Sequence, residues 1–422
     1  MKELVIGGVK ASELTAQYGT PLYVYDQQKL EANLEAYTTY FKSDVFQTRI
    51  LYASKAFQTI GMLDLIAEYG LGVDVVSSGE LYTALKSTMP VEKIYFHGNN
   101  KTTEELRMAL ETGVKHMVVD NVMELEELAG LAAEYKEKLQ VQIRLNVGIE
   151  AHTHEYIVTT HIDSKFGIAF GSSDYEACIA ILKKSDYLAL EGFHVHIGSQ
   201  IFEMDAWYAA IDKMLGYLQT FSEPLTLNLG GGFGVRYTDA DQPMPIKENM
   251  AQIVTYLEDK LQETGVKIRE VMIEPGRSLV AEAGTTLYEI GYQKKTPNKQ
   301  YYFVDGGMGD NIRPSLYQAD YSCDVANNMT AEKSELVTVA GKYCESGDVL
   351  IHDVYLPPVK KGDILAVYST GAYGYAMSSN YNRNATPAVV FVKDGESRVI
   401  VKRQTLADLI RNDVKTEADK HA

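Results

Sequence analysis

The sequence is poor in cysteine and has no long apolar run. Three of its 422 residues are cysteines, the widely separated Cys178, Cys323 and Cys344. This number and spacing cannot build a disulfide framework, and without a CxxC pair no zinc or other metal site is expected. A reducing cytoplasm suits such a chain best. No stretch of about 18 apolar residues occurs, so no membrane span is expected.

Positive charge is also in short supply. The chain has 40 lysines and arginines against 57 acidic residues, which gives a formal net charge of -17. That balance argues against nucleic acid and anionic lipid as partners. Residues 1–8 lack the long apolar core and the cleavage site of a signal peptide. The hydrophobic content of 45% is ample for sizeable cores, and the length suits two domains.

From residue 26 onward, short apolar runs alternate with amphipathic stretches of helical spacing. Eight runs are predicted to be strands: Ile50–Ala56, Gly72–Ser77, Ile94–Asn99, His116–Asn121, Val141–Val147, Gly192–Gly198, Leu225–Gly232 and Glu270–Gly276. Strands separated by helices pair in parallel through right-handed crossovers. The pattern predicts a closed (β/α)8 barrel over residues 26–280, with a doubly wound open sheet as the alternative.

After residue 280 the pattern changes to short β-rich segments between Gly, Asn, Asp and Pro turns. The predicted strands are Leu287–Gln293, Gln300–Asp305, Glu335–Ala340, Asp363–Ser369, Ala388–Val392 and Arg398–Val401. Helical spacing is nearly absent until 406–411. Residues 281–422 are therefore predicted to form an all-β domain, an antiparallel sheet or small barrel. Residues 1–25, with the β-prone stretch Pro21–Tyr25, are expected to join it.

Lys55 ends the first predicted strand, and no charge precedes it in the run Leu51–Ser54. A lysine amine that is partly desolvated at the mouth of a barrel can lose its proton and form a Schiff base with an aldehyde. We predict that Lys55 does this with pyridoxal phosphate. A solvated strand end is the ordinary alternative.

Other chemically informative residues fall at the ends of the remaining strands, where reactive side chains lie in such barrels. They include Asp74, His97, Arg144, His194, His196, Ser199, Gly230–Gly234 and Glu274–Arg277. One such placement would mean little. The same placement in most of eight strands is hard to assign to packing alone.

Two glycine-containing loops follow the seventh and eighth strands. Gly230–Gly234 lets backbone N–H groups approach an anion closely, and Gly276 lies in the next loop. Phosphate sites in these barrels are commonly built from these two loops. No Lys-Ser/Thr follows, so this is not a Walker loop. Together the loops predict a phosphate site, although a glycine cluster alone usually marks a tight turn.

Glu274 and His196 are candidates for contacts with the cofactor ring. A carboxylate beside the ring nitrogen keeps that nitrogen protonated, and Glu274 directly follows the apolar Val271–Ile273. A structural Glu–Arg pair is the alternative. His194 and His196 are expected on opposite faces of one strand, with one of them pointing into the barrel mouth and stacking on the ring. A hydrogen-bonded structural role is the commoner fate of a lone histidine.

The β-domain adds three polar motifs, Arg313–Tyr317, Cys344–Asp348 and Gly371–Tyr375. A cysteine followed directly by a glutamate and a turn is expected to be an exposed thiol. A buried apolar cysteine is the more frequent case.

Together these motifs resemble the fold-type III pyridoxal-phosphate decarboxylases, and most closely the bacterial diaminopimelate decarboxylases. The resemblance covers nearly the whole chain, from Thr20–Asp26 to Asn380–Asn382. Its specific motifs are, in order, YASKA, HVHIGSQ, GGGFG, EPGRSLVAEAG, CESGDVL and GAYGYAMSSNYN. In one departure, the usual arginine-proline-arginine after Asn382 is replaced by Arg383-Asn384-Ala385-Thr386. This is expected to alter the loop and the dimer seam more than the chemistry.

The resemblance implies roles for the matching residues. Lys55 would hold the cofactor, His196 would stack on its ring and Glu274 would contact the ring nitrogen. Further cofactor contacts would come from Asp74, Ser199, Gly231, Gly232, Gly276, Arg277 and Tyr373. Substrate contacts would come from Arg277, Arg313, Tyr317, Glu345 and Tyr373. In a two-fold homodimer, Cys344, as proton donor, and Glu345 would come from the partner chain.

The implied reaction is decarboxylation of meso-2,6-diaminopimelate to L-lysine and carbon dioxide, the last step of lysine biosynthesis. A substrate with a second amino-acid head needs a cationic clamp and one carboxylate, and bidentate arginine suits the clamp. The alternatives are a decarboxylase of ornithine, arginine, carboxynorspermidine or a D-amino acid, a racemase on the same barrel, and a catalytically silent relative that binds a partner. Ala151–Asp163 is the candidate lid.

Overall fold

The computed structural model describes residues 2–149 and 164–415. The chain divides into two compact units, Met1–Leu30 with Ala281–Ala422, and Glu31–Val280. The candidate lid, residues 151–163, lies outside the described residues. Within the described ranges, no helix is both long enough and apolar enough to cross a bilayer.

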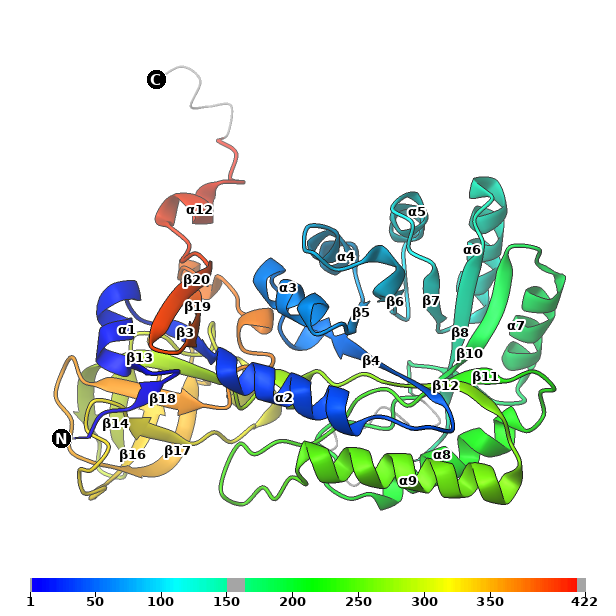
Figure 1. Ribbon diagram of the computed structural model, residues 1–422. Helices are drawn as coiled ribbons and strands as arrows, with labels where there is room; N and C mark the ends of the chain where they lie inside the picture. Colours follow the sequence, from blue (N-terminus) through cyan, green and yellow to red (C-terminus); the bar gives the residue numbers. More distant parts are fainter. Residues whose placement is uncertain (1, 150–163, 416–422) are drawn as a thin grey trace. The chain divides into compact units, whose positions relative to one another are not determined.

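Eight parallel strands close into a barrel in the unit Glu31–Val280 (Figure 1). In ring order they are β4 (Gln47–Ala53), β5 (Gly72–Val75), β6 (Ile94–Phe96), β7 (His116–Val119), β8 (Leu139–Asn146), β10 (Leu188–His194), β11 (Leu225–Asn228) and β12 (Ile268–Ile273). The ring closes where β12 pairs with β4 and where β8 pairs with β10. The predicted (β/α)8 barrel is confirmed, and the open-sheet alternative is wrong.

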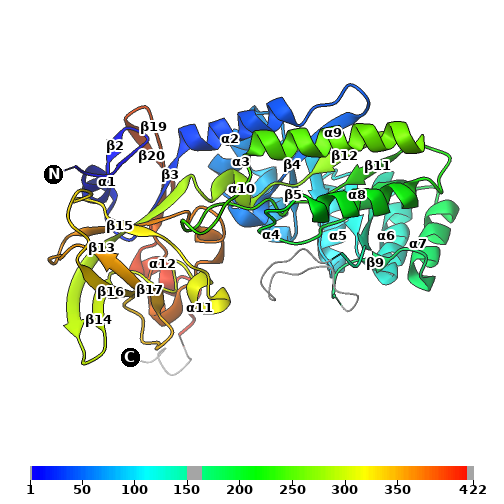
Figure 2. The same cartoon turned by 90° about the horizontal axis from the view of Figure 1, so that it is seen from below.

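Helices connect successive strands and lie outside the barrel (Figures 1 and 2). They are α3 (Ile60–Glu68), α4 (Ser78–Leu85), α5 (Thr103–Glu111), α6 (Val122–Tyr135), α7 (Ser173–Lys184), α8 (Asp205–Leu218) and α9 (Ile246–Thr264), and α2 (Gln27–Tyr40) precedes the first strand. Side-chain caps fix several starts: Thr102 and Glu105 form a capping box on α5, and Asn121 caps α6. The βα loops before these caps carry the polar residues of the barrel mouth.

Each barrel strand ends before the predicted run does. For example, β4 ends at Ala53, β10 at His194 and β12 at Ile273. The apolar parts of these runs are buried in the barrel, whereas the polar and glycine residues that follow leave the hydrogen-bond ladder. Those residues therefore form loops at the C-terminal face, including the turn η1 (Ser54–Ala56) and the short helix α10 (Arg277–Val280). The short strand β9 (Ile168–Ala169) pairs with β8 near the same face.

The other unit contains a mixed β-sheet. Its strands are β3 (Leu22–Asp26), β13 (Gly284–Lys295), β14 (Gln300–Val304), β15 (Cys323–Val325), β16 (Glu335–Ala340), β17 (Val349–Leu356), β18 (Ile364–Tyr368), β19 (Ala388–Lys393) and β20 (Glu396–Val401). As predicted, the N-terminal strand β3 joins this sheet, between β13 and β19. The sheet is mostly antiparallel, as predicted, and it contains two parallel pairings, of β3 with β19 and of β14 with β16. The strands β15 and β17 were not predicted.

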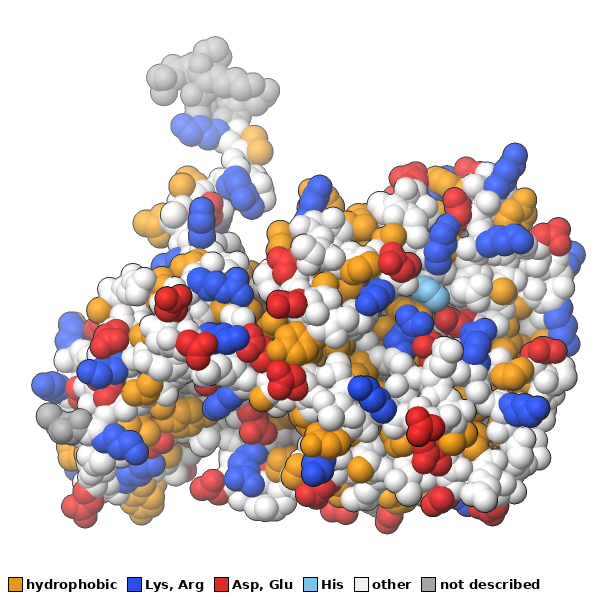
Figure 3. All heavy atoms as spheres, viewed as in Figure 1, with side chains coloured by type: hydrophobic (Ala, Val, Ile, Leu, Met, Phe, Trp, Pro, Cys, Tyr) orange, Lys and Arg blue, Asp and Glu red, His pale blue; other side chains and the backbone are white. Residues whose placement is uncertain are grey.

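Smaller elements complete this unit: the hairpin β1 (Val5–Ile6) and β2 (Val9–Lys10), and the helices α1 (Ala11–Tyr18), α11 (Arg313–Tyr317) and α12 (Leu406–Ile410). The apolar residues of β1, β2, α1, β3 and β19 pack into one buried cluster around Leu22, Val24 and Val390. On the face shown in Figure 3, acidic and basic side chains are interspersed. The excess negative charge is therefore not gathered in a single patch on that face.

Candidate active site

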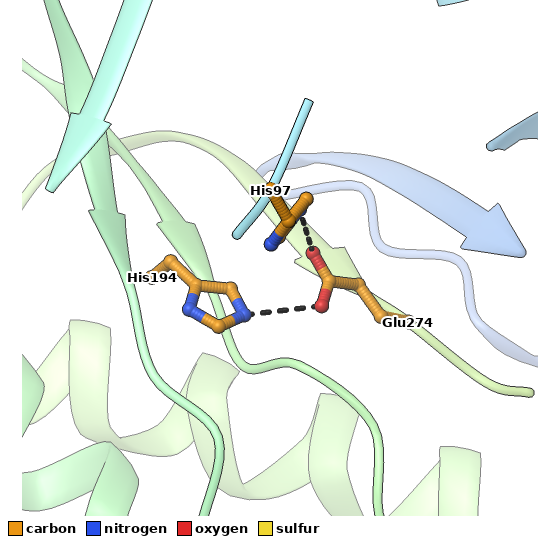
Figure 4. Close-up of side chains that lie close together, drawn as sticks. All are labelled: His97, His194 and Glu274. Atoms are coloured by element: carbon orange, nitrogen blue, oxygen red, sulfur yellow. Dashed lines mark hydrogen bonds and ion pairs between the residues drawn. The ribbon is translucent and has the colours of Figure 1, made fainter. Parts of the chain in front are cut away.

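Glu274 is the central charged group at the mouth of the barrel. It follows β12 and is 6% exposed. His194, the last residue of β10, donates from Nε2 to Glu274 Oε2 at 3.0 Å, and His97, just after β6, brings its Nε2 to 3.1 Å from Oε1. Figure 4 shows both imidazoles pointing at the carboxylate. Burial alone would raise the pKa of Glu274, but the contacts with His97 and His194 outweigh burial and hold the pKa well below its usual range.

The loops after β10, β11 and β12 pack against one another at this mouth. Ile201 and Phe233 form a parallel bridge, and Glu274 N donates to Gly230 O at 2.8 Å. The approach is close enough to require glycine, because a Cβ at Gly231 would lie 2.2 Å from Glu274 O. Gly232 has a φ of +125°, and its added Cβ would lie 2.4 Å from a carbonyl oxygen of the preceding loop. The glycines predicted to bind phosphate are therefore also required by this packing.

Arg277 is held beside these loops by two hydroxyl groups. Its guanidinium donates from Nη2 to Ser199 Oγ at 3.0 Å and from Nη1 to the Tyr237 hydroxyl at 2.5 Å. Ser199 follows β10, and Tyr237 lies in the long loop between β11 and α9. The structure thus brings together Ser199 and Arg277, two of the predicted phosphate contacts.

Lys55 lies in the turn η1, immediately after β4, with an exposed side chain. The side chain is therefore accessible at the barrel mouth, and the partial desolvation of the amine stays a prediction. The neighbouring Asp74 is 4% exposed and accepts from Ser54 N at 3.1 Å. Burial and the charge of Glu274 raise the pKa of Asp74 to about 7, while the positive charge of Lys55 acts in the opposite direction. Asp74 is therefore coupled electrostatically to both Lys55 and Glu274.

His196 also lies at the mouth, so the expectation that His194 and His196 point in opposite directions is wrong. Residues two positions apart on a strand lie on the same face, so strand alternation would not place His194 and His196 on opposite faces. In addition, β10 ends at His194, so His196 lies beyond the strand. His196 Nδ1 accepts from Gly231 N at 3.3 Å. Burial lowers the pKa of His196 well below its usual value, and the charge of Lys55 lowers it further. The imidazole of His196 is accordingly neutral.

The remaining predicted site residues belong to the other unit, where two of the three motifs meet. Ser315 in α11 donates to Gly347 O at 2.6 Å, which joins the Arg313–Tyr317 segment to the Cys344–Asp348 loop. Cys344 N donates to Asn382 Oδ1 at 2.8 Å. Cys344 is the exposed one of the three cysteines, and Glu345 is exposed beside it. Arg313 is buried and donates to the Tyr321 hydroxyl at 2.5 Å.

The third motif and the departing loop of this unit have different neighbours. Tyr373 has a φ of +60° and follows Gly371, whose carbonyl accepts from the Tyr25 hydroxyl of β3 at 2.7 Å. In the departing segment, Arg383 forms an ion pair with Asp413 at 2.9 Å and donates to Leu409 O at 2.6 Å. Arg383 therefore ties the loop to helix α12 and to the residues that follow it.

Sequence reasoning missed two residues that hold the site in place, Asn228 and Tyr237. Asn228 is fully buried at the end of β11 and donates from Nδ2 to Glu274 Oε1 at 2.7 Å. Its signal was a polar side chain at the end of an apolar run, on the same face as Thr226. Tyr237 lies 40 residues before Arg277 in a loop without regular spacing. No sequence pattern pointed to it.

The barrel mouth fits a phosphorylated aldehyde cofactor. Among the described residues, the backbone N–H groups of Gly232 and Gly276 donate to no protein acceptor, although Gly276 is buried. A buried N–H group calls for an acceptor, and a phosphate oxygen supplies one. Arg277 and Ser199 add a cation and a hydroxyl, Glu274 is an anion suited to a protonated ring nitrogen, and Lys55 is an accessible amine.

Comparisons with known proteins agree with this chemistry. The family model for the pyridoxal binding domain of pyridoxal-dependent decarboxylases matches residues 27–281. The diaminopimelate decarboxylases of Bacillus subtilis and Bacillus methanolicus are 47% and 48% identical to this chain, over 97% and 95% of it and 95% and 94% of their own lengths. A crystal structure of the M. jannaschii diaminopimelate decarboxylase in complex with L-lysine superposes with a TM-score of 0.91 at 33% identity, covering 98% of this chain and 96% of that one.

The chain therefore belongs to the pyridoxal-dependent decarboxylases. This membership confirms the predicted enzyme class and pyridoxal phosphate as the cofactor. The roles of the individual residues are addressed next.

Proposed function

We propose that this chain decarboxylates meso-2,6-diaminopimelate to L-lysine. The observation that carries the proposal is the likeness, over nearly the full chain, to relatives named diaminopimelate decarboxylase. The convergence of Lys55, Glu274 and the glycine loops at one barrel mouth supports it. We further propose that the protein acts in the cytoplasm as a homodimer.

The cofactor site is assigned to the barrel. When bound, pyridoxal phosphate supplies an electron sink for the bond that breaks at the substrate α-carbon. Lys55 holds the cofactor through its amine, and Glu274 holds a proton on the ring nitrogen. The neutral imidazole of His196 packs on the ring, and Asp74 and Gly231 line it. Phosphate contacts come from Ser199, Gly232, Gly276, Arg277 and Tyr373.

The substrate contacts are assigned to charged groups. Arg277, Arg313 and Tyr317 bind the distal carboxylate, where a planar guanidinium can donate two parallel hydrogen bonds. Glu345 binds the distal ammonium, and Tyr373 lies beside the substrate. The hydrogen bond between Ser315 and Gly347 supports a joint role for the arginine segment and the Cys344–Asp348 loop. We assign Cys344 and Glu345 to the active site of the second copy in the homodimer.

In the reaction, the bond between the α-carbon and its carboxylate breaks, and carbon dioxide leaves without the electron pair. The α-carbon then takes a proton from the Cys344 thiol, and the thiol recovers its proton from water. Cys344 is exposed, as delivery to another site requires. The other two thiols are buried, and burial raises the pKa of Cys178 and of Cys323 to about 12. Neither of these is suited to exchange protons with solvent.

A carbon dioxide release assay tests the substrate assignment. Purified protein should form one L-lysine per carbon dioxide from meso-diaminopimelate, and cofactor-depleted protein should recover its rate when pyridoxal phosphate is added. For ornithine, arginine and carboxynorspermidine, which lack the distal amino-acid head, kcat/KM should be lower by about 100-fold or more, because buried charged groups would stay unpaired. Equal or faster turnover of any of these would overturn the assignment.

Replacing Cys344 by alanine should slow lysine formation by about 10²–10⁴-fold, since a positioned proton donor contributes about that much. Cofactor absorption should stay unchanged, because the thiol is not assigned to cofactor binding. If the proton reaches another atom instead, more carbon dioxide than lysine is formed, and the ratio of the two products measures this. Cys178→Ala, which removes a buried thiol from α7, is the control. A wild-type rate and product ratio in Cys344→Ala would remove its assigned role.

A further inference from the structure

Asn228 connects the carboxylate at the barrel mouth to the glycine loop. Its Nδ2 donates to Glu274 Oε1 at 2.7 Å and to Gln142 Oε1 at 3.1 Å, and its Oδ1 accepts from Gly230 N at 3.0 Å. Both hydrogens of the amide and one lone pair of its oxygen are therefore used. A fully satisfied, fully buried amide can adopt one orientation only. The position of Glu274 and the turn at Gly230 are thus fixed by the same side chain.

His194 fixes the other oxygen of Glu274. It is 2% exposed, and its Nε2 donates to Oε2 at 3.0 Å. Its Nδ1 has no hydrogen-bond partner among the described residues. A proton on Nδ1 would be a buried donor without an acceptor, so the geometry favours the neutral ring with its hydrogen on Nε2. Burial agrees with this, because it lowers the pKa of His194 to about 4.

His97, His194 and Asn228 therefore surround Glu274 from two strands and one loop, and we call these three residues the Glu274 clamp. His97 approaches from the loop after β6, across the mouth from β10, and its ring lies edge-on to that of His194 with centroids 5.1 Å apart. His194 and Asn228 each donate an N–H to the carboxylate, and His97 brings its Nε2 to 3.1 Å from Oε1. A carboxylate surrounded by donors keeps its negative charge and cannot turn away.

We propose that His194 is a positioning residue that, with Asn228, holds Glu274 ionised and aimed at the cofactor ring. This inference rests on the proposed cofactor site and assigns a role to a histidine that touches neither cofactor nor substrate. The cofactor ring then meets a carboxylate that is already oriented, so binding it requires no rearrangement of Glu274. Loss of the His194 donor should weaken cofactor binding and slow catalysis, because the ring nitrogen then loses its proton more readily.

Asp74 is a carboxylate at the same mouth that lacks a comparable set of hydrogen-bond donors, and its pKa is shifted in the opposite direction from that of Glu274. It is as deeply buried as Glu274, but its carboxylate accepts only from Ser54 N in the described structure. Its pKa is raised to about 7 by burial and by the charge of Glu274. The pKa values of the two acids are therefore shifted in opposite directions, and the donors around Glu274 account for the difference. The clamp thereby selects Glu274, and not Asp74, as the permanent anion.

Two variants of His194 separate the donor from the shape of the ring. His194→Leu removes the N–H, whereas His194→Gln can place an amide N–H near the position of Nε2. Because a hydrogen bond to a charged group is at stake, the Kd for pyridoxal phosphate should rise by about 10- to 100-fold in His194→Leu, and kcat should fall by a similar factor with little change in KM. His194→Gln should stay within about threefold of wild type on this basis.

The matched control is His116→Leu. His116 is a second histidine paired with a buried glutamate, Glu191, at 3.2 Å, but it starts β7 at the opposite end of the barrel. The substitution His116→Leu should leave the affinity for pyridoxal phosphate unchanged. Equal losses in His194→Leu and His194→Gln, or an equal loss in His116→Leu, would reduce His194 to a structural residue and overturn the proposal.

Two further measurements test the Glu274 clamp separately from the proposed function. In the cofactor-free protein, ¹⁵N NMR of the imidazoles should show His194 as the neutral ring protonated at Nε2 from pH 6 to 8, with His194→Gln identifying its signal. A charged ring, or a hydrogen on Nδ1, would contradict the clamp. Cofactor affinity is measured without substrate, so the result does not depend on which amino acid is decarboxylated. If wild-type protein failed to bind pyridoxal phosphate, the proposed function would fall and the NMR result would still test the clamp.

Discussion

Replacing Lys55 by alanine should abolish the visible absorption of the bound cofactor and lower the decarboxylation rate by at least about 1,000-fold, as expected for loss of a covalent catalytic group. Lys55 lies in the turn after β4, and its charge acts on Asp74 and His196. The methyl side chain of alanine has no amine that could bond to an aldehyde. Because Lys55 is exposed, its replacement by alanine should not disturb folding. A folding defect would therefore not explain the loss of absorption and activity.

The location of a second lysine supplies the control. Lys93 is half-buried, precedes β6 at the other end of the barrel and donates to Gly70 O at 2.8 Å. Lys93→Ala should keep both the absorption and the rate. Absorption spectra and turnover of the two variants, together with mass spectrometry after reduction of the loaded protein, locate the attachment. An unchanged spectrum in Lys55→Ala would refute the assignment.

Much of the barrel could be predicted because its strands are local signals. Each is an apolar run bounded by polar residues, and the alternation with helices leaves only parallel pairing. The strand ends could not be predicted to the residue, since β4 ends at Ala53, before Ser54, whereas β10 ends at the polar His194 and leaves the apolar Val195 outside the strand. The β-sheet was harder. The parallel pairing of β3 with β19 joins residues more than 360 positions apart, and no local pattern records it.

Some residues of the candidate site could likewise be predicted from the sequence, and others could not. Lys55, Asp74 and Glu274 could be found because strand ends of a barrel meet at one face. The relative direction of His194 and His196 was misjudged, although residues two apart on a strand share a face. Asn228 escaped notice because its importance depends on three partners, Gln142, Gly230 and Glu274, that only the closed barrel brings to it.

Replacing Glu274 by glutamine should have the second large effect. Both carboxylate oxygens face N–H donors, Oε1 from Asn228 and Oε2 from His194. A glutamine must turn its own N–H₂ toward one of these donors, so one buried hydrogen bond is replaced by a donor–donor contact. The free energy of unfolding should fall by about 1–3 kcal/mol. The rate should fall by about 10²–10³-fold, because no anion remains to hold the ring proton.

Glu191→Gln separates these two effects. Glu191 is also buried and accepts from Gln142 at 3.2 Å, but it belongs to the network around His116 at the far end of the barrel. In Glu191→Gln the free energy of unfolding should fall by a similar amount, while kcat and cofactor absorption stay at wild-type values. In Glu274→Gln the loss of the neighbouring charge should also lower the pKa of Asp74. If Glu274→Gln folds, binds cofactor and keeps its kcat within threefold, ring protonation must come from another group, and the buried Asp74 is then a candidate.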